Sequence, residues 1–280
     1  MISIVFGLAT AVFFASSSLM SSRTVKIIGS ASSVAWVMLV GLVLTLPFVF
    51  AAGIPAEVAP NVGWLLTAGA GNVAGILVAG LALRVGKVGV IAPILATEGA
   101  IAAVIAAVLG ESIAPIVAFV LLVIVGGIVL SAVAPDPEPL DHERPIMAVA
   151  LATGAALLFG VSLYAAGRLS GDLPIAWVLL PARLVGTLAL FIPLLVLRRL
   201  QITRGTVPLV VAMGFTEVLG FVCYAIGAQY AVGVTSVLAS QFAPIAAVMA
   251  YVLFKERLGR LQITGVVVLV LAVTALTIVS

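Results

Sequence analysis

Apolar residues occur along this chain in long blocks, and short polar breaks separate the blocks. The blocks cover about 2–20, 33–52, 62–83, 88–109, 113–134, 145–167, 174–197, 206–227, 232–254 and 261–279. Each block is near the roughly 20 apolar residues that a helix needs to cross a bilayer, and none alternates like a barrel strand. The pattern therefore predicts an all-α polytopic membrane protein with ten transmembrane helices. The first block lacks the basic start of a signal peptide, so we expect it to remain a helix.

Charge and composition narrow the class further. Hydrophobic residues make up 64% of the chain and charged residues only 8%, with a net charge of +3. The bases fall at helix ends, where they act as topology signals, so we expect no nucleic-acid partner. The only histidine, His142, lies between blocks, and no Asp lies inside one. This argues against histidine or aspartyl catalysis in the membrane, and we expect no enzyme, no cofactor and no metal site.

The second half of the chain repeats the first. When 88–109 is aligned with 232–253, ten of the 22 residue pairs are identical. Weaker matches follow in the same order, such as Asn72 with Glu217 in a shared Gly-x-x-x-x-x-Gly frame. Short apolar matches arise easily by chance, but several in register indicate a duplication.

The boundary between the halves is a polar segment rich in Pro and acid, at 135–145. It is expected to be an exposed linker between a first repeat at 1–134 and a second at 146–280. Each repeat holds five helices, an odd number, so the second must enter the membrane in the opposite sense. Such inverted repeats are typical of transporters with a substrate site near the midplane.

The helix cores at 102–111 and 243–258 resemble the drug/metabolite transporter superfamily, in particular ten-helix exporters built from two EamA-type repeats. Each core carries the family's Glu, at Glu111 and Glu256, and Arg183 lies where the second helix of a repeat usually carries Arg. Leu42, at the matching place in the first repeat, departs from that pattern. The resemblance implies a multi-pass transporter of the cell (inner) membrane that moves amino acids, other metabolites or drugs, with helices 1, 3, 4, 6, 8 and 9 around a central cavity.

The distribution of bases predicts an orientation. The connections after helices 1, 3, 5, 7 and 9 hold eleven bases and the other side holds only Arg168, with Arg183 inside the membrane. The eleven are Arg23, Lys26, Arg84, Lys87, Arg144, Arg198, Arg199, Arg204, Lys255, Arg257 and Arg260. The positive-inside rule then places these connections in the cytoplasm and both termini outside. The family resemblance implies the reverse, so the two indications conflict.

Three charged residues lie inside the apolar blocks: Glu98, Arg183 and Glu217. An ionisable group in a membrane helix costs at least about 2.5–3.5 kcal/mol, so it is a functional candidate. Both glutamates lie about ten residues into their helices, near the midplane. The repeat alignment gathers Asn72, Glu98, Glu217 and Gln241 into one central layer. We interpret this layer as a substrate site in which Glu217 or Glu98 carries a coupling proton; the alternative is interhelical hydrogen bonding.

Neighbouring polar residues extend the candidate site. Thr97 lies beside Glu98, and Tyr224 and the serines at 16–18 are expected to line the cavity, whereas the phenylalanines are expected to pack. Arg183 either binds a substrate carboxylate or is structural, snorkelling to the interface or capping a broken helix. Pro93 and Pro244 interrupt helices 4 and 9 near these residues, as suits a gate.

Two kinds of transport remain open from the sequence. The favoured function is a secondary transporter, exporting small organic solutes by alternating access with possible proton coupling. The competitor is a divalent-cation transporter or channel of the same fold, because Glu98 and Glu217 offer oxygen ligands. The expected partners are a small-molecule substrate and membrane lipid, and the protein is expected to be a monomer or homodimer.

Overall fold

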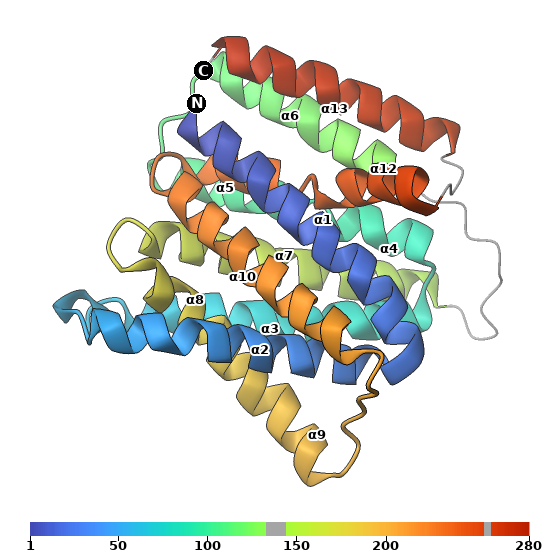
Figure 1. Ribbon diagram of the computed structural model, residues 1–280. Helices are drawn as coiled ribbons and strands as arrows, with labels where there is room; N and C mark the ends of the chain where they lie inside the picture. The colour runs from blue at the N-terminus through green and yellow to red at the C-terminus, as the bar shows by residue number, and fades with distance from the viewer. Residues whose placement is uncertain (133–143, 255–258, 280) are drawn as a thin grey trace.

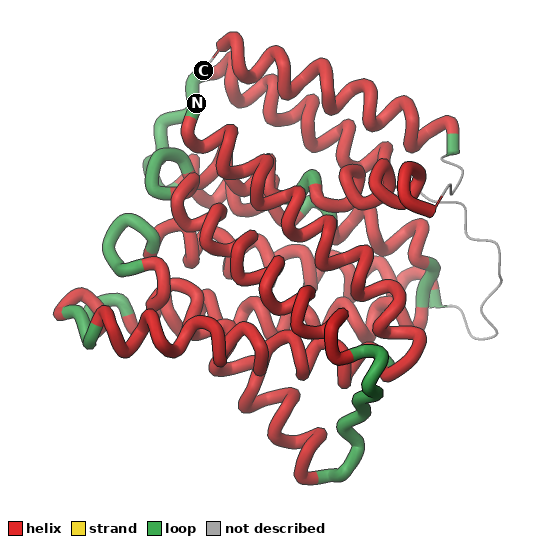
Figure 2. The backbone as a smooth tube through the Cα atoms, viewed as in Figure 1, coloured by secondary structure: helices red, strands yellow, loops and turns green. Residues whose placement is uncertain are grey.

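The computed structural model describes residues 1–132, 144–254 and 259–279, and in them only helices and loops occur (Figures 1 and 2). The helices are α1 (Ile2–Ile28), α2 (Ser30–Ala52), the 3₁₀-helix η1 (Ala56–Val58), α3 (Val62–Val85), α4 (Val88–Leu95), α5 (Glu98–Val108), α6 (Pro115–Ala132), α7 (Pro145–Leu169), α8 (Ile175–Gly186), the π-helix η2 (Thr187–Phe191), α9 (Ile192–Val196), α10 (Val207–Ala228), α11 (Val232–Ala239), α12 (Phe242–Phe254) and α13 (Arg260–Val279).

These helices follow one another as ten rods, three of which are divided: α4 with α5, α8 with η2 and α9, and α11 with α12. In the described residues eight stretches are long and apolar enough to cross a membrane, and two shorter apolar helices lie at 115–130 and 260–276. The protein is therefore an all-α polytopic membrane protein, as the apolar pattern predicts.

The expected end of the first helix at about residue 20 is wrong. Helix α1 continues to Ile28, and Gly29 alone, at φ 77°, separates it from α2. The polar residues near its end stay helical because their side chains bond within the helix, as the Ser22 hydroxyl does to the Leu19 carbonyl oxygen. Arg23 and Lys26 consequently lie on the last turns of α1.

The expected linker falls largely outside the described residues, as do Glu256 and His142. Its last two residues, Arg144 and Pro145, are described, and both are exposed. Pro145 is the first residue of α7, where a proline needs no hydrogen-bond donor. The Arg144 backbone N–H donates to the Val85 carbonyl oxygen at 2.8 Å, so this end of the segment is fixed to the end of α3.

The rod formed by α4 and α5 and the rod formed by α11 and α12 break at matching places in the two halves. Ala96 and Thr97 separate α4 from α5, and Ser240 and Gln241 separate α11 from α12. These positions correspond under the same alignment that pairs 88 with 232. The breaks lie three residues after Pro93 and before Pro244, so the prolines mark the region without occupying the break.

The helices pack in pairs that exchange when the halves are exchanged. Helix α3 packs on α7 and α10 packs on α1; likewise α3 packs on α8 and α10 on α2. The pairs α2 with α8 and α6 with α13 map onto themselves. Figure 1 shows α6 and α13 side by side at one edge of the bundle. Because the two halves present equivalent helix faces, the helices of each half pack mainly against helices of the other half.

One exchange-related pair is not balanced. Helix α11 packs closely on α5, whereas α12 and α4, the counterparts of these two helices, have no comparable packing in the described part of the chain. Helix α11 also contacts α6 and α7. The two halves therefore meet through α11 and α5 on one side of the bundle, whereas on the other side α4 and α12 lie apart.

Candidate functional site: a cavity at the helix breaks

A cavity of about 380 Å³ lies between the two halves. It is lined by Phe14, Ser17, Ser18, Ser21, Val34, Val37, Met38, Asn72, Ile76, Glu98, Phe159, Ser162, Leu163, Met213, Glu217, Phe221 and Phe242. The second half of α1 and the first half of α2, on either side of the α1–α2 turn, contribute seven of these residues, and the others come mainly from the middle of α3, α7 and α10. Glu98 and Phe242, the first residues after the two helix breaks, lie at the midpoint of their rods. The cavity thus occupies the side on which α4 and α12 are apart.

Arg183 and Glu217 form an ion pair beside this cavity. The Arg183 Nη1 lies 3.0 Å from the Glu217 Oε1, and the side chains are 1% and 19% exposed. A Cβ at Gly41 would lie 2.8 Å from the Arg183 Cδ, so the glycine provides the room that the arginine needs. The guanidinium also lies 5.0 Å from the centre of the Phe221 ring. Arg183 is thus enclosed between α2 and α10, and Glu217 stands between it and the cavity.

Glu98 has a different environment. It is the first residue of α5, half-buried, and its side chain borders the cavity. Among the described residues no hydrogen-bond or ion-pair partner of its carboxylate occurs. Of the two cavity carboxylates, one is therefore neutralised by an arginine and one is not.

The comparisons with known proteins agree with this architecture. The family model described as the EamA-like transporter family matches residues 1–133 and again 146–278. The chain belongs to the EamA-like transporter family. It is therefore a membrane transporter of the drug/metabolite transporter superfamily, with a small-molecule substrate.

A solved structure supports the fold of this EamA-like transporter. A crystal structure described only as that of a protein superimposes with a TM-score of 0.82 at 16% identity, covering 99% of this chain and 96% of its own. The similarity extends over the whole bundle and shows the fold alone. Curated proteins give no match to the chain.

The predicted polar layer of the EamA-like transporter is only partly assembled. Asn72, Glu98 and Glu217 border the cavity together. Gln241 does not: it is 5% exposed and borders a second, mostly apolar groove of about 400 Å³ between α1, α12 and α13. The break before α12 turns Phe242, and not Gln241, toward the centre. The repeat alignment predicts how far along its helix a residue lies, but the rotation of the helix decides whether its side chain faces the cavity.

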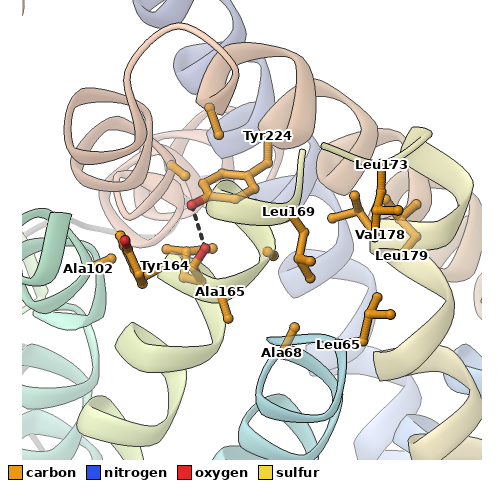
Figure 3. Close-up of a cluster of buried hydrophobic side chains, with 14 of the residues drawn as sticks. Leu65, Ala68, Ala102, Tyr164, Ala165, Leu169, Leu173, Val178, Leu179 and Tyr224 are labelled. Carbon is orange, nitrogen blue, oxygen red and sulfur yellow. Dashed lines mark hydrogen bonds between the residues drawn. The ribbon is translucent and has the colours of Figure 1, made fainter. Parts of the chain in front are cut away.

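Tyr224 and Thr97 also lie apart from the cavity wall. The Tyr224 hydroxyl donates to the Leu163 carbonyl oxygen at 2.7 Å and lies 2.9 Å from the Ser236 hydroxyl, in a buried cluster shown in Figure 3. The Thr97 hydroxyl bonds to the Ile94 carbonyl oxygen at 2.7 Å, which satisfies it within the break. Tyr224 thus joins α10 to α7 and α11, whereas the Thr97 bond is local to the break between α4 and α5. Tyr224 is on the side that α11 closes.

Other cavity residues were missed or misassigned from the sequence. Phe14, Phe159, Phe221 and Phe242 border the cavity although phenylalanine is expected to pack in a membrane protein. Ser17 and Ser18 line it as expected, whereas the Ser16 hydroxyl bonds to the Val12 carbonyl oxygen. The Arg183–Glu217 pair was not anticipated, although two opposite charges in neighbouring membrane helices are themselves a signal for pairing.

Arg183 fits the structural alternative more closely than substrate binding. Its side chain is 1% exposed and pairs with Glu217. It borders only a small space of about 10 Å³ beside the cavity, which shares Asn72, Ser162 and Phe221 with the cavity wall. Within the described part of the chain, no group of three or more His, Cys, Asp or Glu side chains is placed to share a metal ion.

Proposed function

We propose that this protein is a secondary transporter that exports small organic metabolites, such as amino acids or drugs, by alternating access. The observation that carries the proposal is the cavity at the helix breaks, which combines a carboxylate without a partner with an apolar wall. Ligand sites are usually such concave, mostly apolar spaces with a few polar groups.

The unbalanced packing of the two halves supports alternating access. The side of α11 and α5 is closed, and the side of α4 and α12 is open. Since the halves are copies, the opposite state needs only an exchange of their arrangements, with α4 packing on α12. A solute in the cavity would then be released on the other side of the membrane.

We propose Glu98 as the proton-coupling residue and Glu217 as the counter-ion of the buried Arg183. A coupling group must bind its proton in one state and lose it in the other. Glu98 has no cationic partner that would keep it charged. Glu217 has one at 3.0 Å, and the buried Arg183 depends on this contact for the pairing of its charge.

The test uses purified protein in proteoliposomes with an imposed pH gradient. Solute accumulation from a metabolite panel is compared with divalent-metal flux. We expect organic solute to accumulate uphill, and Glu98→Gln to retain downhill exchange but lose the response to the gradient. Glu217→Gln is expected to lower transport in both modes because it releases Arg183.

Several results would decide against these assignments. Metal flux without organic solute flux would favour the divalent-cation alternative. Loss of gradient response in Glu217→Gln but not in Glu98→Gln would reverse the roles of the two glutamates. Uphill transport that is independent of pH in the wild type would point to another coupling ion.

A further inference from the structure

We infer that the preferred substrate is a monovalent organic cation, an amine attached to a ring-sized apolar body. This inference rests on the transport function proposed above and concerns the same cavity. It is carried by the charge of the cavity wall and by the arrangement of its aromatic rings.

One of the two carboxyl groups in the wall has no positively charged partner among the described residues. The ionisable residues of the wall are Glu98 and Glu217, and Arg183 neutralises only Glu217. The hydroxyl of Tyr224 is a neutral group that is hydrogen bonded to the Leu163 carbonyl oxygen and the Ser236 hydroxyl, so it does not compensate the Glu98 carboxylate. A charge in a partly dehydrated cavity is costly unless it is paired, so an ammonium group beside Glu98 would be favoured.

Other charge types fit this wall less well. A substrate carboxylate would need a cationic donor, but the guanidinium of Arg183 is 1% exposed and lies behind Glu217 and Phe221. A zwitterion therefore loses at its carboxylate what it gains at its ammonium. A divalent metal ion prefers six or more oxygen ligands, whereas one free carboxylate, Asn72 and four serines spread along the cavity are a sparse set.

Four phenylalanines form part of the apolar wall of the cavity that Glu98 borders. The Phe14 and Phe221 ring centres are 5.0 Å apart in an edge arrangement, and those of Phe14 and Phe242 are 6.5 Å apart. Phe242 follows the break between α11 and α12, as Glu98 follows the break between α4 and α5. Ring faces attract cations and ring edges pack against flat apolar groups. A volume of about 380 Å³ is near the small end for ligand sites, so the body is one or two rings in size.

The experiment measures binding of four matched probes to the purified full-length protein in lipid nanodiscs. The probes share a phenyl body and differ in charge: 2-phenylethylammonium, 3-phenylpropionate, phenylalanine and 2-phenylethanol. We expect the ammonium probe to bind at least about tenfold more tightly than the other three, the typical effect of one desolvated charge pair. Binding should weaken as the pH falls, because protons compete for Glu98.

Three variants locate the effect. Glu98→Gln should weaken binding of the ammonium probe by at least about tenfold and leave 2-phenylethanol nearly unchanged. Glu57→Gln, at an exposed acid in the connection between α2 and α3, is the matched control and should bind like the wild type. Phe242→Leu should weaken the phenyl probes together, and it tests the site even if Glu98→Gln is unstable.

Tighter binding of phenylalanine or phenylpropionate than of the ammonium probe would overturn the inference, as would failure of all four to bind. Unchanged ammonium binding in folded Glu98→Gln would also overturn it. The proposed function fails separately: if the ammonium probe binds but does not cross the proteoliposome membrane, the charge assignment holds and the transport assignment does not.

Discussion

At the scale of single residues, the Arg183–Glu217 pair shows how this membrane protein accommodates charge. Each group would be unfavourable alone, and together they satisfy one another between α8 and α10. The Nε and Nη2 atoms of Arg183 are buried without a partner among the described residues, so the arginine depends strongly on Glu217. Removal of either residue should therefore lower the free energy of unfolding by more than the intact pair contributes to it.

We expect Arg183→Met to destabilise the protein by about 3 kcal/mol, the usual cost of breaking a buried ion pair. Glu217→Gln should cost a similar amount because it strands the arginine. The double variant should recover much of the loss, since neither charge remains. Thermal unfolding in detergent measures all three, and strictly additive losses would show that the two residues do not interact.

At the scale of helices, a carboxylate from one half holds a helix of the other. The Glu111 side chain accepts hydrogen bonds from the Val232 N–H at 3.0 Å and the Gly233 N–H at 3.1 Å, at the start of α11. A carboxylate at a helix N-terminus is stabilised by otherwise unpaired N–H groups and by the helix dipole. This contact fastens α11 on the closed side of the cavity.

Glu111→Ala is therefore expected to lower stability by about 1–2 kcal/mol, as loss of a helix cap does. It should also shift the protein away from the state that is closed on the α11 side. Hydrogen exchange should rise selectively at the start of α11. Glu57→Ala removes an exposed acid and is the control. Equal exchange in both variants would show that Glu111 does not hold the helix.

The helix breaks depend on a close approach at Gly99. A Cβ at this position would overlap the Ser240 hydroxyl and the Ser236 carbonyl oxygen, where α5 meets α11. The residue must remain a glycine for the two broken helices to cross. The same contact explains why α5 and α11 pack so closely on the closed side.

We expect Gly99→Ala to separate α5 from α11 and to lower the melting temperature markedly. Gly80→Ala is the matched control, because Gly80 lies in α3 with nothing near its Cβ position. There the alanine should be neutral or stabilising by about 0.5–1 kcal/mol. Equal effects of the two substitutions on the melting temperature would contradict the role of the α5–α11 contact.

At the scale of the whole molecule, the cavity and the bases lie toward the same side. Helix α1 borders the cavity with its second half, and its last turns carry Arg23 and Lys26; Arg84 is in the last turn of α3, which ends on the same side. Under the charge rule this side is cytoplasmic and the structure faces inward. The start of α1 and the end of α13 lie near each other on the other side of the bundle (Figure 1).

The orientation is tested by cysteine labelling in a Cys223→Ser background, which has no other cysteine. We expect an impermeant reagent to reach Ser18→Cys, in the cavity wall, from the cytoplasmic side. Exposed Glu57→Cys and a cysteine at position 280 should react only from outside. The reverse labelling of Glu57→Cys and position 280 would place the termini in the cytoplasm, as the family resemblance implies.

The sequence by itself determined the class, the succession of apolar helices and the duplication. Continuous apolar blocks admit only helices in lipid, because every backbone group must be bonded internally. It also identified Glu98, Glu217 and Asn72, because polar groups are conspicuous in an apolar background. The helical stretch beyond residue 20 was missed, since a membrane helix can extend into water without an apolar signal.

Tertiary structure alone decided how these residues are used. Helix rotation turned Gln241 and Tyr224 away from the cavity and brought Phe14 and Phe242 to it. Packing paired Arg183 with Glu217 and left Glu98 without a partner, which gave two similar acids different roles. The direction in which the cavity opens came from unequal packing of two similar halves. Each of these depends on contacts between distant segments, which an apolar pattern along one chain does not specify.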